Sequence, residues 1–182
     1  MELTHDFRQR TALLLGDERM ARLQNARVAV FGLGGVGGAC AEALCRAGVG
    51  RLTLVDNDTV SLSNINRQIV ALHSTVGQPK TAALRARLLD INPACDIEEK
   101  NLFFDQSTAD SIDFSAFDYV IDAIDTVSAK LLLVERARAP PAAAWRTPCQ
   151  SRRSHNRTPK NRCCPPCSDQ KTDSFLLYRT PG

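Results

Sequence analysis

The feature that most constrains this chain is a glycine cluster that directly follows a run of apolar residues. Five of the chain's ten glycines fall within residues 32–38, immediately after the apolar segment 28–31. This order predicts a buried strand, a tight turn and the start of a helix. Gly32, Gly34 and Gly37 fit the pattern G-x-G-x-x-G, in which the missing side chains let the backbone approach a phosphate group beside a helix N-terminus. Alone, the pattern predicts a nucleotide site only weakly, because a glycine turn can also pack a helix tightly onto a sheet.

The segments around this cluster alternate between strand and helix patterns. Strands are expected over residues 27–31, 51–55, 96–102 and 119–121, and helices over 36–47, 77–91 and 126–138, after two short helices within 6–25. Such alternation predicts an α/β fold, a Rossmann-like doubly wound and mostly parallel sheet with helices at its N-terminal side. Ligands of these sheets bind at the carboxyl ends of the strands, where Gly34, Asp56 and Asp122 are all expected.

Asp56 stands at the end of the second expected strand, 24 residues after Gly32. This is close to the spacing at which an acidic side chain binds ribose hydroxyls. The polar segment 56–76 is much longer than the usual βα connection of about two to six residues, and long loops tend to carry function. The turn, the carboxylate and the loop together predict one nucleotide-binding crevice.

A change of composition divides the chain near residue 138. Residues 1–138 contain 15 basic and 18 acidic residues, whereas residues 139–182 contain 8 basic and 2 acidic ones. The second segment also holds seven of the nine prolines and lacks Val, Ile, Met and Glu, a composition that does not predict a packed core. We therefore expect a truncated nucleotide-binding domain in 1–138 and an irregular tail in 139–182 that is disordered or translated out of frame.

Cysteine usage and hydropathy bear on location. Seven cysteines, an odd number without a readable signal peptide, favour a reducing compartment, so the cytoplasm is the expected location. Cys164 and Cys167 form a single C-x-x-C pair, whereas a structural zinc commonly draws on two pairs, and a zinc site there stays open. The most apolar run, residues 28–41, is shorter than the roughly 20 residues that span a bilayer, so no membrane partner is expected.

Four ordered segments within residues 1–138 resemble the ThiF-type, ubiquitin-activating-like adenylyltransferases. They are Gly32-x-Gly34-Gly35-Val36-Gly37, Asp56-Asn57-Asp58-x-Val60-x-x-Ser63-Asn64-x-Asn66-Arg67-Gln68, Gly77-Gln78-Pro79-Lys80 and Asp122-Ala123-Ile124-Asp125. The second segment is the most specific, because it is long and ordered. Segments 64–74 and 122–130 are most similar to the tRNA threonylcarbamoyladenosine dehydratase branch of this family, and the resemblance stops near residue 138.

The resemblance implies an activity and a role for each matching residue. Members of the family bind ATP with Mg²⁺ and join AMP to a carboxylate, and the dehydratase branch activates the modified adenosine of tRNA in this way so that its side chain cyclises. The resemblance implies that Gly32, Gly34, Gly35 and Gly37 approach the nucleotide, that Asp56 binds the ribose, that Asn64, Arg67, Gln68 and Lys80 line the phosphates, that Asp122 faces the magnesium, and that Arg10 reaches the nucleotide of a partner subunit. Arg10, Arg67 and Lys80 are the expected catalytic residues, since in-line attack builds negative charge that cations neutralise.

The expected partners are ATP, tRNA, a second copy of the chain in a homodimer, and a sulfur-carrier-type protein. Two other functions stay open at this point. One is an ATP-binding fragment with impaired catalysis, because family proteins extend well beyond residue 138. The other is a NAD-dependent oxidoreductase, because the glycine turn with Asp56 also suits NAD, although NAD explains neither the Asn/Arg/Gln loop nor Lys80.

Overall fold

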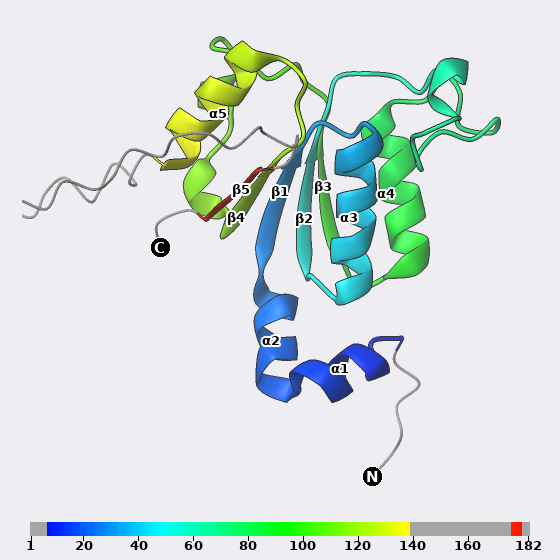
Figure 1. Cartoon of the computed structure of the whole chain (residues 1–182), viewed down its shortest axis with the longest axis vertical. Coiled ribbons are helices and arrows are strands. Elements are labelled where there is room, and N and C mark those ends of the chain that lie inside the picture. The colour runs from blue at the N-terminus through cyan, green and yellow to red at the C-terminus, as the bar shows by residue number, and fades with distance from the viewer. Residues whose placement is uncertain (1–6, 139–175, 180–182) are drawn as a thin grey trace, which may run out of the picture.

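The computed structural model describes residues 7–138 and 176–179, and in them five strands form a single sheet (Figure 1). The strands lie in the order β3-β2-β1-β4-β5. Their bounds are β1 (Arg27–Phe31), β2 (Arg51–Val55), β3 (Asp96–Lys100), β4 (Tyr119–Asp122) and β5 (Leu176–Arg179). The first four run parallel, and β5 pairs antiparallel with β4. The predicted, mostly parallel sheet is therefore confirmed.

Helices cover both faces of this sheet. The chain forms α1 (Gln9–Leu15), α2 (Asp17–Asn25), α3 (Gly35–Ala47), α4 (Lys80–Ile91) and α5 (Val127–Arg138), with short 3₁₀ turns η1 (Leu62–Asn64), η2 (Ala109–Ser111) and η3 (Phe114–Ala116). Helices α3 and α4 pack on one face and α5 on the other, which is the doubly wound arrangement that the alternating pattern predicted (Figure 1). None of the helices among the described residues is long and apolar enough to cross a bilayer.

Each face of the sheet has its own apolar core. Because successive side chains of a strand point to opposite faces, Val30 joins the aliphatic cluster under α3 and α4, whereas Phe31 joins the cluster under α5. The second cluster is aromatic: the ring of Phe31 lies 5.0 Å from that of Phe104 and 5.9 Å from that of Phe114. Burial on both faces explains why β1, β2 and β4 are mostly apolar, whereas β3, at the edge of the sheet, buries only Ile97.

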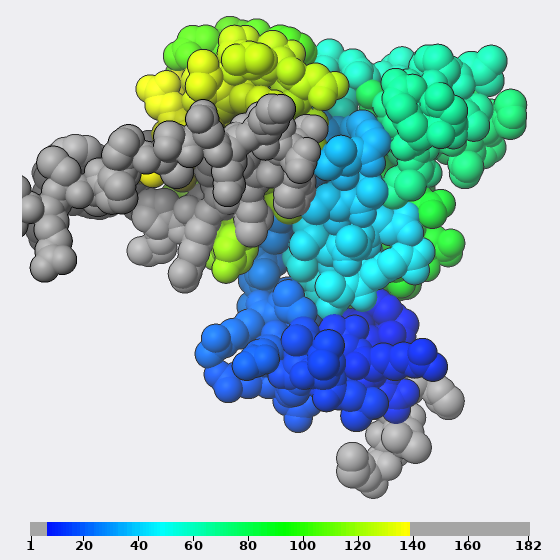
Figure 2. Space-filling view, in the orientation of Figure 1, coloured from blue at the N-terminus to red at the C-terminus, as the bar shows by residue number. Residues whose placement is uncertain are grey.

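The end of the sheet at which the parallel strands begin, its amino end, is closed by ion pairs between neighbouring strands. Arg27 Nη2 lies 3.1 Å from Asp118 Oδ1, and Arg51 Nε lies 2.7 Å from Asp96 Oδ2. Helices α1 and α2 form a lobe beyond this end (Figure 2), and α1 buries none of its side chains. The opposite, carboxyl end of the sheet stays open.

The tail predicted from residue 139 onward is described only at residues 176–179, which form β5. Its composition did not predict this strand. Pairing with the edge of β4 uses backbone groups, so it does not require the β-branched pattern that identified the other strands. Cys164 and Cys167 lie outside the described residues. Within the described part, Cys40, Cys45 and Cys95 are free thiols.

Candidate functional site

A cleft of about 640 Å³ lies at the carboxyl end of the sheet, where the glycine turn, the long loop and the β4–α5 connection meet. Pockets for small ligands commonly measure about 300–1,000 Å³, so this cleft has the size of a ligand site. Eight of the predicted site residues line it: Gly32, Gly34, Gly35, Asp56, Asn64, Arg67, Gln68 and Lys80. The fold thus brings together lining residues that are up to 98 positions apart in sequence, from Phe31 to Ala129.

The four glycines of the turn that are expected to approach a nucleotide differ in what surrounds them. Gly32 has a φ of +85°, and a Cβ on it would overlap the carbonyl group of Ala123; a Cβ on Gly37 would overlap the carbonyl oxygen of Gly32. These two glycines make the turn possible, and Gly37 does not line the cleft. In contrast, the nearest atom to a Cβ on Gly34 would be a side-chain nitrogen 3.9 Å away, and Gly35 also lines the cleft. Gly34 therefore leaves space for a ligand, whereas a Cβ on Gly35 would lie 3.3 Å from the carbonyl oxygen of Arg67.

The N-terminus of α3 opens beside this space. Gly34 is its N-cap residue and supplies no side-chain hydrogen bond, so the first-turn amides of the 13-residue helix have no capping side chain. Free amides and the positive end of a helix dipole favour an anionic group such as a phosphate.

Asp56 joins the glycine turn to the long loop. Its Oδ2 accepts a hydrogen bond of 2.6 Å from the backbone amide of Leu33, and its Oδ1 accepts one of 2.7 Å from the amide of Asp58. The carboxylate is half-buried and lines the cleft. It is therefore held in place by backbone groups, and its remaining lone pairs can accept hydrogen bonds from ligand hydroxyls.

The long loop is closed at its base by backbone hydrogen bonds. The amide of Val60 donates to the Gln78 carbonyl and that of Gly77 donates to the Val60 carbonyl, both at 2.8 Å. Further along, Asn64 Oδ1 accepts from the Ser61 amide at 3.0 Å, which fixes the η1 turn. These contacts hold the polar side chains of the loop against the cleft.

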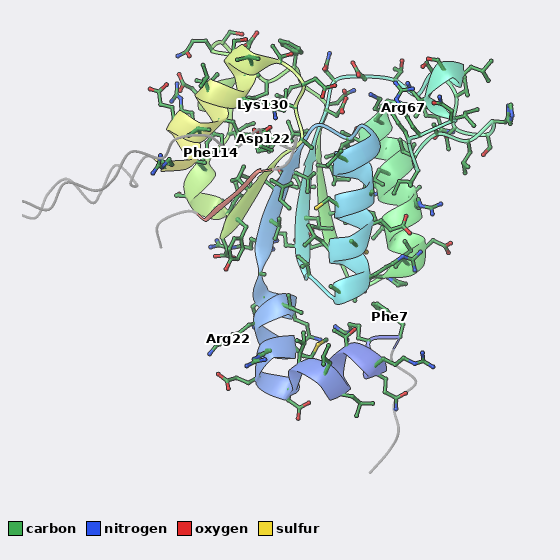
Figure 3. All side chains as sticks on the ribbon, viewed as in Figure 1. Phe7, Arg22, Arg67, Phe114, Asp122 and Lys130 are labelled. Atoms are coloured by element: carbon green, nitrogen blue, oxygen red, sulfur yellow. The ribbon has the colours of Figure 1, made fainter. Side chains whose placement is uncertain are left out.

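Two side chains of this loop have unused hydrogen-bonding capacity at the cleft. Arg67 is exposed, and its Nη1 donates to the Ser63 carbonyl and to Asn66 Oδ1, each at 3.0 Å, which leaves other guanidinium donors free (Figure 3). Gln68 is buried, and its Oε1 has no hydrogen-bond partner among the residues that the structure describes.

Lys80 begins α4 and turns its ammonium group toward the loop. The side chain is only 7% exposed, and Nζ lies 2.7 Å from Oδ2 of Asp58, whose side chain is 59% exposed. The Lys80 amide also donates to the Asp58 carbonyl at 2.9 Å. A buried ammonium group thus has its charge balanced by a carboxylate at the cleft surface.

Asp122 ends β4 but lies behind the wall of the cleft. Its carboxylate is fully buried, and Oδ1 accepts hydrogen bonds of 3.1 Å from both the Ile124 amide and Lys130 Nζ (Figure 3). Its Oδ2 is buried without a partner. The cleft lining itself includes Asp125, which is exposed. Asp122 therefore shapes the β4–α5 connection from inside.

Carboxylates outnumber cations in the cleft wall. The charged residues that line it are Asp56, Asp58, Asp125, Arg67 and Lys80. A polyphosphate would therefore meet a net negative wall, which favours a divalent cation as a companion of the ligand. Within residues 7–138 and 176–179, no three His, Cys, Asp or Glu side chains are grouped to hold a metal by themselves, so such a cation would be shared with the ligand's oxygens.

Arg10 is not part of this cleft. It is exposed on α1, beyond the amino end of the sheet and therefore far from the glycine turn (Figure 1). Conversely, an apolar part of the lining, formed by Phe31 and residues 102–104, was not among the predicted site residues. The run Leu-Phe-Phe follows the carboxyl end of β3, and that position was a usable signal, because all parallel strands end at the same edge.

Comparison with known proteins places these features in a family. A model described as the ThiF family matches residues 8–170. The tRNA threonylcarbamoyladenosine dehydratase of Bacillus subtilis is 47% identical over 133 residues, which cover 73% of this chain and 52% of that protein. The crystal structure of E. coli tRNA N6-threonylcarbamoyladenosine dehydratase with AMP has a TM-score of 0.70 at 38% identity and covers 76% of this chain and 58% of that one. The same enzyme with ATP gives a TM-score of 0.67 at 37% identity, covering 74% and 56%. The chain spans about half the length of the curated relatives it matches.

Proposed function

The chain belongs to the ThiF family, and from this we propose that its cleft binds ATP and transfers AMP to a carboxylate, that of threonylcarbamoyladenosine in tRNA. The dehydratases of B. subtilis and E. coli support this acceptor, and the E. coli structures with AMP and ATP support the nucleotide. One observation carries the proposal: eight residues expected to bind the nucleotide, drawn from a turn, a strand end, a loop and a helix start, line a single cleft.

The cleft has distinct places for the three parts of ATP. The apolar wall of Phe31 and residues 102–104 suits a purine base, since aromatic and aliphatic surfaces stack on its faces. Asp56 is fixed where it can accept hydrogen bonds from the ribose hydroxyls. Gly34 and the α3 N-terminus on one side, with the loop and Lys80 on the other, would enclose the phosphates.

These residues supply the charge that adenylation requires. A carboxylate oxygen of the acceptor attacks the α-phosphorus in line, the new oxygen–phosphorus bond forms, and the bond to pyrophosphate breaks. Negative charge grows on the α-phosphate oxygens and on the departing pyrophosphate. Arg67 and Lys80 would neutralise it, because both cations face the cleft and Lys80 is shielded from water. The resulting acyl adenylate is the activated group that lets the modified side chain cyclise.

Magnesium fits the donors of this cleft. Hard divalent cations prefer carboxylate and phosphate oxygens, and the end of β4 supplies two carboxylates: Asp125 on the cleft wall and Asp122, whose buried Oδ2 lacks a partner. We propose that these residues and the phosphates hold the ion. When bound, it supplies positive charge to the phosphate oxygens and offsets the acidic wall.

We further propose that the chain acts as a homodimer in which Arg10 serves the cleft of the neighbouring copy. The support is its place: Arg10 is exposed on a helix that buries none of its own side chains, and it does not line the cleft of its own chain. The cytoplasm, as the site of a tRNA substrate, and a sulfur-carrier-type protein partner belong to the same proposal.

The test is binding of ATP with Mg²⁺ by calorimetry to the wild type, Asp56→Ala and Lys80→Met. We expect saturable binding that falls about ten- to hundredfold in Lys80→Met, the usual loss for a hydrogen bond to a charged group. Asp96→Asn, which alters an ion pair at the other end of the sheet, is the matched control and keeps wild-type affinity. NAD should not saturate the cleft, and tighter binding of NAD than of ATP would refute the proposal.

Exchange of labelled pyrophosphate into ATP then tests chemistry apart from binding. The acceptor is tRNA that carries threonylcarbamoyladenosine, and the exchange is expected to depend on Arg67 and Lys80. Because the chain spans about half the length of its relatives, ATP binding without exchange would favour the alternative of a nucleotide-binding fragment over a complete adenylyltransferase.

A further inference from the structure

The ion pair between Lys80 and Asp58 joins a buried ammonium group to a solvent-exposed carboxylate. The Lys80 side chain is 7% exposed, whereas that of Asp58 is 59% exposed, and their charged atoms are 2.7 Å apart. Among the residues that the structure describes, Asp58 is the carboxylate that pairs with this ammonium group. The cation is therefore confined, and the anion is the partner that solvent and ligands can reach.

Backbone contacts fix Asp58 in place and leave its side chain free to turn. Its amide donates to Asp56 Oδ1 at 2.7 Å, and its carbonyl accepts from the Lys80 amide at 2.9 Å. Neither bond involves the Asp58 carboxylate. Rotation about the side-chain torsions can thus release Lys80 Nζ without moving the loop, the end of β2 or the start of α4.

A phosphate group in this cleft would compete with Asp58 for the same ammonium group. Both residues line the cleft together with the open glycine Gly34, and the wall already carries more carboxylates than cations. A phosphate placed beside Lys80 would be repelled by Asp58 if that carboxylate stayed where it is. Its departure relieves the repulsion and passes the cation to the ligand.

We infer that the Asp58 carboxylate is a placeholder for a nucleotide phosphate: it neutralises Lys80 in the empty cleft and is displaced when the phosphate binds. This inference rests on the proposed binding of ATP and adds to it an exchange of partners at Lys80. The exchange keeps a buried cation paired in both states, and it lowers ATP affinity by the strength of the pair that must be broken.

The experiment measures the affinity of ATP in a metal chelator for the wild type, Asp58→Asn and Asp125→Asn. Asparagine keeps the shape of the aspartate and removes its charge, so Lys80 has no ion pair with residue 58 before ATP binds. We expect Asp58→Asn to bind ATP about three- to fivefold more tightly than the wild type, as for release of a partly exposed ion pair. Asp125→Asn removes one charge from the same wall without releasing a cation, so it should tighten binding less.

Two further measurements tie the effect to Lys80 and to phosphate. In a Lys80→Met background, Asp58→Asn should improve ATP affinity by less than about twofold, because no cation remains to be released. Adenosine, which lacks phosphates, should bind the wild type and Asp58→Asn equally. Thermal unfolding of each variant verifies that the affinities are those of folded protein.

The outcomes separate this inference from the proposed function. If the wild type binds ATP but Asp58→Asn binds it equally or more weakly, the exchange is refuted and ATP binding stands. Equal tightening by Asp58→Asn and Asp125→Asn, or an effect that persists in Lys80→Met, would also refute it, since simple repulsion would then suffice. A wild type that binds neither ATP nor adenosine would overturn the proposed function, and the exchange with it.

Discussion

The two ends of the sheet carry the same kinds of charged residue and use them in opposite ways. At the amino end, Arg27 pairs with Asp118 and Arg51 pairs with Asp96. Each pair joins the start of one strand to the start of its neighbour, or to the residue just before it. At the carboxyl end, the strand-terminal Asp56 accepts hydrogen bonds from the backbone of the glycine turn and the long loop. One end ties strands to each other, and the other holds loops around a cleft.

The two ends of the same strands therefore contribute differently: the amino end to the stability of the fold, and the carboxyl end to ligand binding. Ion pairs at the amino end are satisfied by the protein itself, so they need no ligand. At the carboxyl end, two buried oxygens, Oε1 of Gln68 and Oδ2 of Asp122, have no partner, and cations and carboxylates line a cleft. We therefore expect substitutions at the amino end to change the free energy of unfolding, and substitutions at the carboxyl end to change ligand affinity.

The largest effects are expected from substitutions at two glycines of the turn that are three residues apart. They test whether every glycine at the carboxyl end serves the same purpose, either stability or ligand binding. In Gly37→Ala the new methyl group would overlap the Gly32 backbone, so we expect destabilisation of about 3 kcal/mol in urea unfolding. In Gly34→Ala the methyl group has room, so stability should stay near that of the wild type while ATP affinity falls about tenfold or more. Equal loss of stability in both variants would show that the whole turn is structural.

A smaller effect is expected when the amino end is altered. Arg27→Met removes a guanidinium group that donates to both oxygens of Asp118 at 3.1 and 3.3 Å. The two side chains are each 41% exposed, so we expect a loss of about 0.5–1 kcal/mol in the free energy of unfolding. ATP affinity, measured on the same preparation, should not change. A loss of affinity at unchanged stability would contradict the division between the two ends.

The smallest effect concerns a carboxylate remote from either end, Glu42 on α3. Hydrogen bonds from Arg87 and, to a lesser extent, Arg46 hold the pKa of Glu42 below its ordinary value near 4.5. The stabilisation is therefore present above that value and disappears as the pH falls below it. Glu42→Gln should cost less than about 1 kcal/mol at neutral pH, and its difference from the wild type should shrink as the pH falls below the ordinary pKa of a glutamate, until the Glu42 carboxylate is protonated in the folded protein. A difference that grows in acid would contradict this assignment.

Most of the fold could be predicted from the chain because its signals are local. The expected bounds 27–31 and 51–55 coincide with β1 and β2, and the helix expected to end before Gly48 is α3. Hydrophobic periodicity, glycine turns and proline positions act over a few residues, so one sequence suffices to read them. β5 was not predicted, because it pairs with a strand more than fifty residues earlier in the chain and lies in a segment of atypical composition.

The site was less predictable, because its details depend on which neighbours the fold supplies. Motif positions located eight of the cleft's lining residues. They did not show that Gly37 faces the turn rather than the cleft, that Asp122 is fully buried, or that Lys80 pairs with a carboxylate 22 residues earlier. Packing and pairing of this kind are tertiary properties. The roles assigned to these residues stay predictions until ligand binding is measured.

The closed base of the long loop has a consequence for how such a chain can vary. The bonds between Val60 and residues 77–78 bring the loop ends together, and the entropy lost in closing the loop grows only slowly with the number of residues beyond these bonds. Residues 72–74 and 76 are exposed, whereas Asn64 and Gln68 are buried and line the cleft. Doubling the length of a flexible loop costs only about 0.6 kcal/mol. Insertions in the exposed half could therefore lengthen the loop, and with it the outer surface beside the cleft, while the half that lines the cleft keeps its place.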